Sequence, residues 1–160
     1  MLVKLGFRKP LLRIEDKMIV YLDTSSLVKL YVLEEDSHTI EKLVESSDVV
    51  ATSLIAYAEA RSAFARRLRE DVFSNDEYRQ ILSCFDQDWE NCLRIGVTGA
   101  LVRRAGDLAE KHGLRGFDAI HLSSAITFRE ELSFPVYFSC SDQKLQKASR
   151  MENLMQPGQI

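Results

Sequence analysis

The sequence contains few of the features that mark specialised classes of protein. Its 160 residues include only three cysteines, Cys84, Cys92 and Cys140, and no CxxC pair. An odd number of cysteines without metal-ligand spacing argues against a disulfide framework and favours a reducing compartment. No apolar run approaches the roughly 20 residues that a membrane span needs, and no stretch has the form of a signal peptide. We therefore expect a cytoplasmic protein that does not enter a membrane.

The net charge of the chain is also small. The chain has 21 basic and 24 acidic residues, which gives a net charge of −3. This balance excludes a protein that binds nucleic acid through bulk positive charge. A metal-dependent nuclease stays open, because its site must itself be acidic. The hydrophobic content of 46% is typical of a globular domain that buries a core without disulfides.

The N-terminal segment differs in charge from the rest of the chain. Residues 1–17 carry five basic and two acidic side chains, and the strand-like run MIVYLD begins at Met18. We predict an extension or leader at 1–17, a domain at 18–150 and a C-terminal tail at 151–160. The leader could result from an upstream start codon, or it could be an ordered extension that packs on the domain or contacts RNA.

Strand and helix patterns alternate along the domain. Strands are predicted at 19–22, 49–51 and 136–139, where apolar runs lack the alternation of half-buried strands. Helices are predicted from an N-cap at Ser37, from an N-cap at Ser53 to about Glu70, from a capping box at Ser74, from Thr98 to His112, from Phe117 to about Glu131, and after Asp142. This order indicates an α/β domain with a small, mainly parallel sheet and a helical excursion in the middle of the chain.

Four acidic residues lie at positions that suggest chemistry. Asp23 ends the first predicted strand, and Asp142 follows the last one by a few residues. In open α/β sheets, sites form outside the carboxyl ends of the strands. Glu59 and Asp118 lie within apolar segments, where an unpaired charge is costly.

Each of these acids also has a structural explanation. Asp23 and Asp142 could be helix N-caps, and Asp118 could be a first-turn acid that stabilises the helix dipole. Glu59 could pair with Arg61 or Arg115. Taken one at a time, the acids favour the structural explanation.

As a set, the acids favour a metal site. Carboxylates about 4 Å apart repel by about 4 kcal/mol per pair at an effective dielectric constant near 20, so a cluster needs protons or a cation. Oxygen ligands without cysteine or histidine suit Mg²⁺ or Mn²⁺. Such ions activate water and offset the charge that develops when a phosphodiester bond is cleaved.

Four segments together resemble the motifs of PIN-domain ribonucleases. In order, they are 20–29 (VYLDTSSLVK), 52–61 (TSLIAYAEAR), 116–125 (GFDAIHLSSA) and 139–145 (SCSDQKL), and they span nearly all of 18–150. Within that family, the size and form of the chain resemble the VapC-type toxins of toxin–antitoxin pairs. The 17 residues before the first strand and the tail after Arg150 depart from the family pattern.

The resemblance implies a three-layer α/β/α fold and a Mg²⁺- or Mn²⁺-dependent endoribonuclease. It implies that Asp23, Glu59, Asp118 and Asp142 form an acidic pocket that holds the metal, with Ser25 and Ser141 behind these ligands or in contact with the metal's water. It also implies a homodimer, and a small antitoxin whose tail enters the acidic groove.

Two further features have competing explanations. His121 could be a general base, but a hydrogen-bonded histidine of the core or groove is the favoured interpretation. Arg61, Arg66 and Arg67 could form a rim that tracks RNA phosphates, or a solvated face with ion pairs.

We predict a metal-dependent endoribonuclease from these observations. Two alternatives come from other classes. One is a catalytically silent PIN fold that acts as a binding module. The other is a phosphoryl-transfer α/β domain that uses Asp23, although Ser25 stands where a phosphatase usually has a second Asp.

Overall fold

A central parallel sheet organises the chain. The computed structural model describes residues 17–132 and 134–159, so the predicted N-terminal extension, apart from Lys17, lies outside the described residues. Within these ranges, the sheet has four parallel strands in the order β3-β2-β1-β4. The strands are β1 (Ile19–Leu22), β2 (Val49–Ser53), β3 (Leu93–Ile95) and β4 (Tyr137–Ser139).

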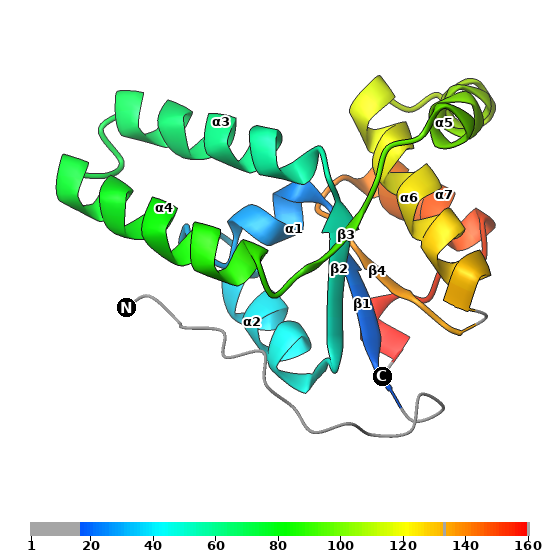
Figure 1. Ribbon diagram of the computed structural model, residues 1–160, viewed down its shortest axis with the longest axis horizontal. Coiled ribbons are helices and arrows are strands. Elements are labelled where there is room, and N and C mark those ends of the chain that lie inside the picture. The colour runs from blue at the N-terminus through cyan, green and yellow to red at the C-terminus, as the bar shows by residue number, and fades with distance from the viewer. Residues whose placement is uncertain (1–16, 133, 160) are drawn as a thin grey trace.

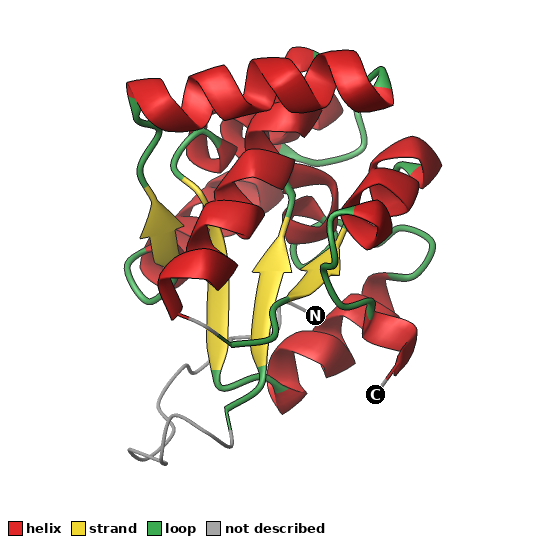
Figure 2. Cartoon of the chain, turned by 90° about the vertical axis from the view of Figure 1, so that its right-hand side faces the viewer, coloured by secondary structure: helices red, strands yellow, loops and turns green. Residues whose placement is uncertain are grey.

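Helices cover both faces of this sheet (Figures 1 and 2). One face carries α1 (Thr24–Val28), α2 (Ser37–Ser46), α3 (Ala56–Arg69) and α4 (Asn75–Trp89), and the other carries α5 (Gly99–His112), α6 (Gly116–Leu132) and α7 (Gln143–Met151). A short 3₁₀ helix, η2 (Pro157–Gln159), follows. The predicted three-layer α/β/α fold is confirmed. None of the helices in the described ranges is long and apolar enough to cross a bilayer.

The layers follow from the side-chain alternation of β1. Val20 and Leu22 belong to the core on the α1–α4 side, whereas Ile19 and Tyr21 belong to the core on the α5–α7 side. All four residues are buried. Successive side chains of a strand point to opposite faces, so one apolar strand supplies both cores.

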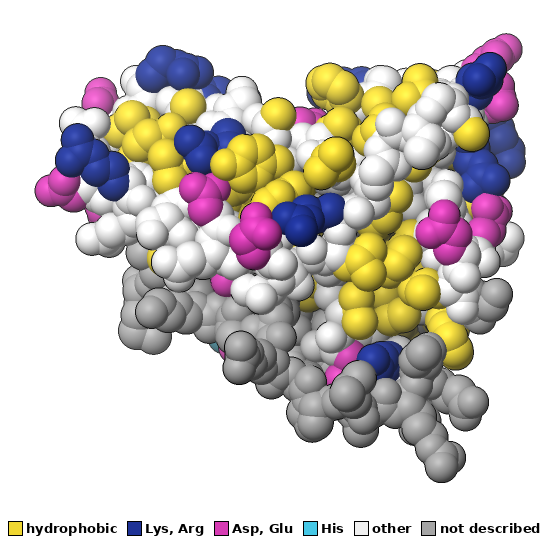
Figure 3. Space-filling view, in the orientation of Figure 1, with side chains coloured by type: hydrophobic (Ala, Val, Ile, Leu, Met, Phe, Trp, Pro, Cys, Tyr) yellow, Lys and Arg dark blue, Asp and Glu magenta, His cyan; other side chains and the backbone are white. Residues whose placement is uncertain are grey.

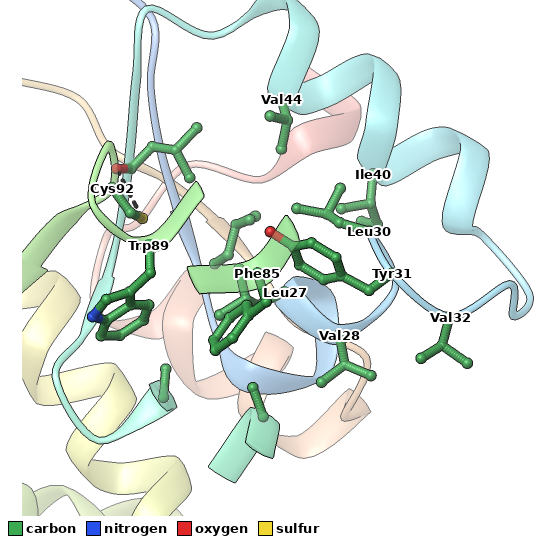
Figure 4. Packing of buried hydrophobic residues seen from close by; sticks show 14 of the residues in the cluster. Leu27, Val28, Leu30, Tyr31, Val32, Ile40, Val44, Phe85, Trp89 and Cys92 are labelled. Carbon is green, nitrogen blue, oxygen red and sulfur yellow. Dashed lines mark hydrogen bonds between the residues drawn. The ribbon is translucent and has the colours of Figure 1, made fainter. Parts of the chain in front are cut away.

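Aromatic rings cluster within the core on the α1–α4 side, among them Tyr31, Phe85 and Trp89 (Figure 4). The Phe85 ring lies 5.4–5.7 Å, centroid to centroid, from those of Tyr31, Tyr57, Phe64 and Trp89. Phe85 and Trp89 are one turn apart on α4, and both are buried. These contacts hold α3 and α4 together and pack them on Tyr31, which follows α1.

The direction of the chain through the sheet reverses beside β1. The chain moves outward from β1 to β2 and β3, and then returns along α5 and α6 to β4 on the other side of β1. The carboxyl ends of β1 and β4 therefore flank a topological switch point, where α/β folds form their binding crevices. The space-filling view shows a notch in the upper outline of the molecule, between the two helical layers (Figure 3).

The structure confirms some predicted helix boundaries. Ser74 opens α4 with a complete capping box, Thr98 caps α5, and Gly113 ends α5 in a left-handed conformation. Two N-caps were wrong: Ser53 is the last residue of β2, and Ser37 lies inside α2 after its N-cap Asp36.

The reasons for these errors are local. The chain makes a turn at 54–55 before α3 starts, so Ser53 stays in the sheet. The Ser37 hydroxyl bonds to the preceding loop, accepting from the Glu34 amide at 2.9 Å and donating to the Val32 carbonyl at 3.1 Å. Strand β3 was missed because it is short, and Leu93 and Arg94 are exposed.

The predicted tail at 151–160 includes residues that pack on the domain. Leu154 is buried in the core on the α5–α7 side. The Met155 backbone bridges to β4, where its carbonyl accepts from the Phe138 amide at 2.9 Å and its amide donates to the Val136 carbonyl at 3.0 Å. This segment therefore covers part of the outer edge of β4.

Phe85→Ala tests the aromatic core. Phe85 is 1% exposed, and removing a buried phenylalanine side chain costs about 3–5 kcal/mol. We expect a loss of that size in the free energy of unfolding by urea titration. Val72→Ala, at a side chain that is 49% exposed, should cost less than about 0.5 kcal/mol. Equal losses in the two variants would contradict the packing described.

Candidate active site

The sheet and two helices bring the four predicted acids to one end of the fold. Asp23 directly follows β1, and Asp142 follows β4. Glu59 lies in the first turn of α3, and Asp118 in the first turn of α6. Asp23 is buried, Glu59 and Asp118 are partly exposed, and Asp142 is exposed.

Asp23 is held by the backbone around it. Its Oδ1 accepts from the Ser26 amide at 2.9 Å and from the Ser25 hydroxyl at 2.7 Å. Its own amide donates to the Ser139 carbonyl at 3.0 Å, which continues the pairing of β1 with β4. Asp23 is thus the N-cap of α1, as the structural explanation predicted. Its Oδ2 accepts no hydrogen bond from the residues described.

Ser25 joins the two loops at the switch point. Its hydroxyl donates to Asp23 and accepts from the Ser141 amide at 2.9 Å. Asp142 caps α7 by accepting from the Leu145 amide at 2.8 Å through Oδ1. The predicted supporting residues Ser25 and Ser141 therefore lie beside Asp23 and Asp142.

Glu59 has polar partners other than the arginines considered for it. Its Oε2 accepts from the Thr24 hydroxyl at 2.6 Å and lies 2.8 Å from Nε2 of His121. The pairing with Arg61 or Arg115 was wrong, because Arg61 reaches across to α4 instead. Burial by itself would raise the pKa of Glu59, but the bonds from His121 and Thr24 outweigh it and lower that pKa.

Asp118 has the opposite electrostatic environment. No hydrogen bond to its carboxyl group is present among residues 17–132 and 134–159. Burial and then the charge of Asp142 raise its pKa, and the charge of Glu59 adds to this against Arg115 and His121. Burial is also the largest cause of the raised pKa of Asp23, to which the Asp118 charge contributes. Asp118 is therefore the acid through which these carboxyl groups act on one another, because it lies within the influence of Asp142 and Glu59 and itself acts on Asp23.

His121 is a buried, hydrogen-bonded histidine, as the favoured interpretation had it. It is 2% exposed, and its Nδ1 lies 2.9 Å from the Tyr21 hydroxyl. Its Nε2 contacts Glu59 and also lies 3.0 Å from the Thr24 hydroxyl. Neither Tyr21 nor Thr24 was among the predicted site residues. Tyr21 looks like any strand residue of the core, whereas Thr24 directly follows Asp23 and could have been considered.

The arginines of α3 differ in their partners. Arg61 donates to the Tyr57 hydroxyl at 3.0 Å and lies 3.4 Å from an Asp86 oxygen. Arg67 forms an ion pair with Glu34. Arg66 has no ion pair with any residue that the structure describes. Ion pairs thus engage two of the three arginines of the predicted rim.

Comparison with known proteins identifies the family. The model of the family described as "PIN domain" matches residues 20–134. The chain belongs to the PIN-domain family.

Several known proteins are similar to this PIN domain. Ribonucleases VapC45 and VapC49, from two strains of Mycobacterium tuberculosis (CDC 1551 / Oshkosh and H37Rv), are each 33% identical to it over 108 residues, 68% of this chain and 75% of theirs. The VapBC2 structure from Rickettsia felis, bound to a DNA fragment from their promoter, matches with a TM-score of 0.58 at 20% identity over 87% of this chain and 97% of that one. FitAcB from Neisseria gonorrhoeae matches with a TM-score of 0.59 at 15% identity over 89% and 100%. The two structural matches show the shared fold.

The donor chemistry of this PIN domain fits a hard divalent cation. The acids offer only oxygen, and Asp23, Glu59 and Asp142 each leave one carboxylate oxygen without a hydrogen bond from the described residues. A cation would offset the charges of Asp142 and Glu59 that act on Asp118. As the side chains lie, no three His, Cys, Asp or Glu residues in the described ranges are close enough to enclose a metal. The fit is therefore one of donor type and charge, which suits Mg²⁺, an ion that keeps several water ligands and uses one or two carboxylates.

Asp118→Asn should stabilise the metal-free PIN domain at neutral pH. A carboxyl group whose pKa is raised on folding binds more protons when folded, so its ionisation costs stability as the pH rises through that pKa. In EDTA at pH 7 we expect a gain of about 0.5 kcal/mol, kept small by solvent screening, or about 1–2 °C in melting temperature. The gain should disappear near pH 3, where the Asp118 carboxyl group is protonated in the folded and in the unfolded protein.

Asp107→Asn provides the control, since Asp107 is an exposed acid of α5 away from the site. It should leave the melting temperature unchanged at both pH values. A lower melting temperature for Asp118→Asn than for the unmodified protein at pH 7 would contradict the repulsion described.

Proposed function

We propose that this PIN domain is a metal-dependent endoribonuclease that hydrolyses RNA phosphodiester bonds and is the toxin of a toxin–antitoxin pair. The observation that supports this most directly is the placement of four carboxyl groups at one end of the sheet, where Asp118 is acted on by Asp142 and Glu59 and itself acts on Asp23. The relatives at 33% identity are named as VapC ribonucleases, which agrees with it. The cofactor in this proposal is Mg²⁺ or Mn²⁺.

Different residues would bind the cation and restrain the loops that carry its ligands. Asp23, Glu59, Asp118 and Asp142 would hold the ion, directly or through water. When bound, such an ion lowers the pKa of a water molecule and offsets charge at the reacting phosphate. Ser25 restrains both loops, because it bonds to the Asp23 carboxylate and to the Ser141 amide. Asp23 and Asp142 also cap helices, so the helix ends restrict how far their carboxylates can turn.

The rim that would bind RNA phosphates stays a prediction for Arg61, Arg66 and Arg67. Arg66 is the best candidate of the three, since no described acid pairs with it. Arg61 and Arg67 would have to exchange a carboxylate partner for a phosphate, which reduces their net gain.

The burial of Asp23 argues against the phosphoryl-transfer alternative. A phospho-acceptor must be approached by the donor phosphorus, yet Asp23 is 5% exposed and one of its oxygens accepts two hydrogen bonds. The silent binding module shares every geometric feature with the nuclease, so only an assay separates the two.

Cleavage of total cellular RNA tests the proposed activity. We expect discrete fragments with Mg²⁺ or Mn²⁺ and none with EDTA. Asp118→Asn should lower the rate at least 100-fold, because it removes a carboxylate that would hold the cation. The measurement is the rate of substrate loss on denaturing gels.

Asp107→Asn is again the matched control and should cleave at the unmodified rate. Undiminished cleavage by Asp118→Asn would contradict the site. If no preparation cleaves RNA and Mn²⁺ does not raise the melting temperature, the binding module becomes the better explanation.

The proposed partners are a second copy of the chain and a small antitoxin, and the proposed location is the cytoplasm. The resemblance to VapC toxins supports all three. For the dimer, light scattering on the purified protein should give twice the 18.3 kDa of one chain. A mass of one chain at micromolar concentration would contradict the dimer and leave the nuclease proposal intact.

A further inference from the structure

A continuous line of polar groups runs through the interior from β1 to Glu59. The Tyr21 hydroxyl contacts Nδ1 of His121 at 2.9 Å, and Nε2 of His121 contacts Oε2 of Glu59 at 2.8 Å. Tyr21 is 0% and His121 2% exposed. The line therefore joins three elements, β1, α6 and α3, out of contact with solvent for most of its length.

The partners determine where the protons lie. The Tyr21 hydroxyl lies 2.9 Å from Nδ1 of His121 and can donate to it. With Nδ1 accepting, Nε2 carries the hydrogen and donates to Glu59. The Thr24 hydroxyl donates to the same Glu59 oxygen. Both donors thus act on Oε2, and Oε1 receives no hydrogen bond from the described residues.

The same line also sets the spacing of two acids. Asp118 and His121 are three residues apart on α6, so they lie on one face of that helix. A bond between His121 and Glu59 therefore fixes α3 against the face of α6 that carries Asp118. A free glutamate side chain has three rotatable bonds, and restricting it before a ligand arrives reduces the entropy lost on binding.

We propose that Tyr21 and His121 are positioning residues, which orient Glu59 so that its Oε1 is presented to the divalent cation. This inference rests on the proposed function, because it presupposes that the acids bind a cation. His121 acts through Glu59 and touches neither the cation nor the RNA. A histidine with a purely structural role would contribute to folding but would not affect the affinity for metal.

Two substitutions of His121 separate these roles. Glutamine can place its amide nitrogen near the position of the imidazole Nε2 and still donate to Glu59. Asparagine is one methylene shorter, so its amide reaches only the region of Nδ1. The measurement is the Mn²⁺ concentration at half-maximal thermal stabilisation. We expect about a tenfold increase for His121→Asn, in the range found for groups that orient metal ligands, and less than threefold for His121→Gln.

Tyr21→Phe tests the far end of the line without touching Glu59. It keeps the ring that stacks on Phe138 and removes the donor to Nδ1. We expect the half-maximal Mn²⁺ concentration to rise about threefold. This variant also keeps the proposal testable if the substitutions at His121 fail to fold.

Ser123→Ala is the matched control on the same helix. The buried Ser123 hydroxyl donates to the Leu101 carbonyl at 2.9 Å, on the side of α6 that faces α5. Its loss should lower the melting temperature without changing the Mn²⁺ dependence.

The outcomes distinguish the positioning role of Tyr21 and His121 from the metal site on which it rests. If Mn²⁺ stabilises the unmodified protein but not Asp118→Asn, and His121→Asn and Tyr21→Phe respond as the unmodified protein does, the positioning role is overturned and the metal site stands. A lower half-maximal concentration in His121→Asn would also overturn it, since His121 would then hold Glu59 away from the cation. If Mn²⁺ does not stabilise the unmodified protein, the metal site and the positioning role fall together.

Discussion

The burial of β1 on both faces is the constraint on which the rest of the structure depends. A four-residue strand with apolar side chains on both sides can be satisfied only between two helical layers. Parallel neighbours on both edges then align their carboxyl ends with its own. Asp23 is the first residue beyond that strand, and its amide still pairs with Ser139. The position of the buried acid is thus set by the sheet rather than by a flexible loop.

The acids gathered at this end are not equivalent. Glu59 receives two donors and has a lowered pKa, whereas Asp118 has no donor among the described residues and a raised one. One carboxylate is therefore stabilised in its charged form by the protein, and another is left to be compensated by something else. Carboxyl groups with pKa values shifted by burial and by neighbouring charges, lying in a crevice, are candidates for functional residues.

Sequence patterns predicted the layers and the acids because these depend on local features. An unbroken apolar run indicates a doubly buried strand, and an acid after such a strand lies at a known edge of the sheet. The partners of Glu59 could not be predicted in the same way. Thr24 and His121 are 35 and 62 residues away from it in the chain, and nothing in either segment identifies the other.

Helix starts were harder to predict than helix interiors, for a related reason. A serine before an apolar stretch has the same appearance whether it caps the helix or ends the preceding strand, as Ser53 does. Strand β3 was not predicted, because it lies at the edge of the sheet and two of its three side chains are exposed. A strand of this kind is formed by its backbone pairing with β2, for which side-chain hydrophobicity is a poor indicator.

The bridge between Met155 and β4 bears on how the protein behaves at high concentration. An uncovered edge strand exposes amide and carbonyl groups that can pair with the same edge of another molecule. Here the chain returns to its own edge, and the backbone groups of Val136 and Phe138 are used within the molecule. Shortening the chain before Leu154 would expose these groups together with the apolar surface that Leu154 covers. The segment around Met155 thus occupies the edge of β4 and opposes edge-to-edge pairing between molecules.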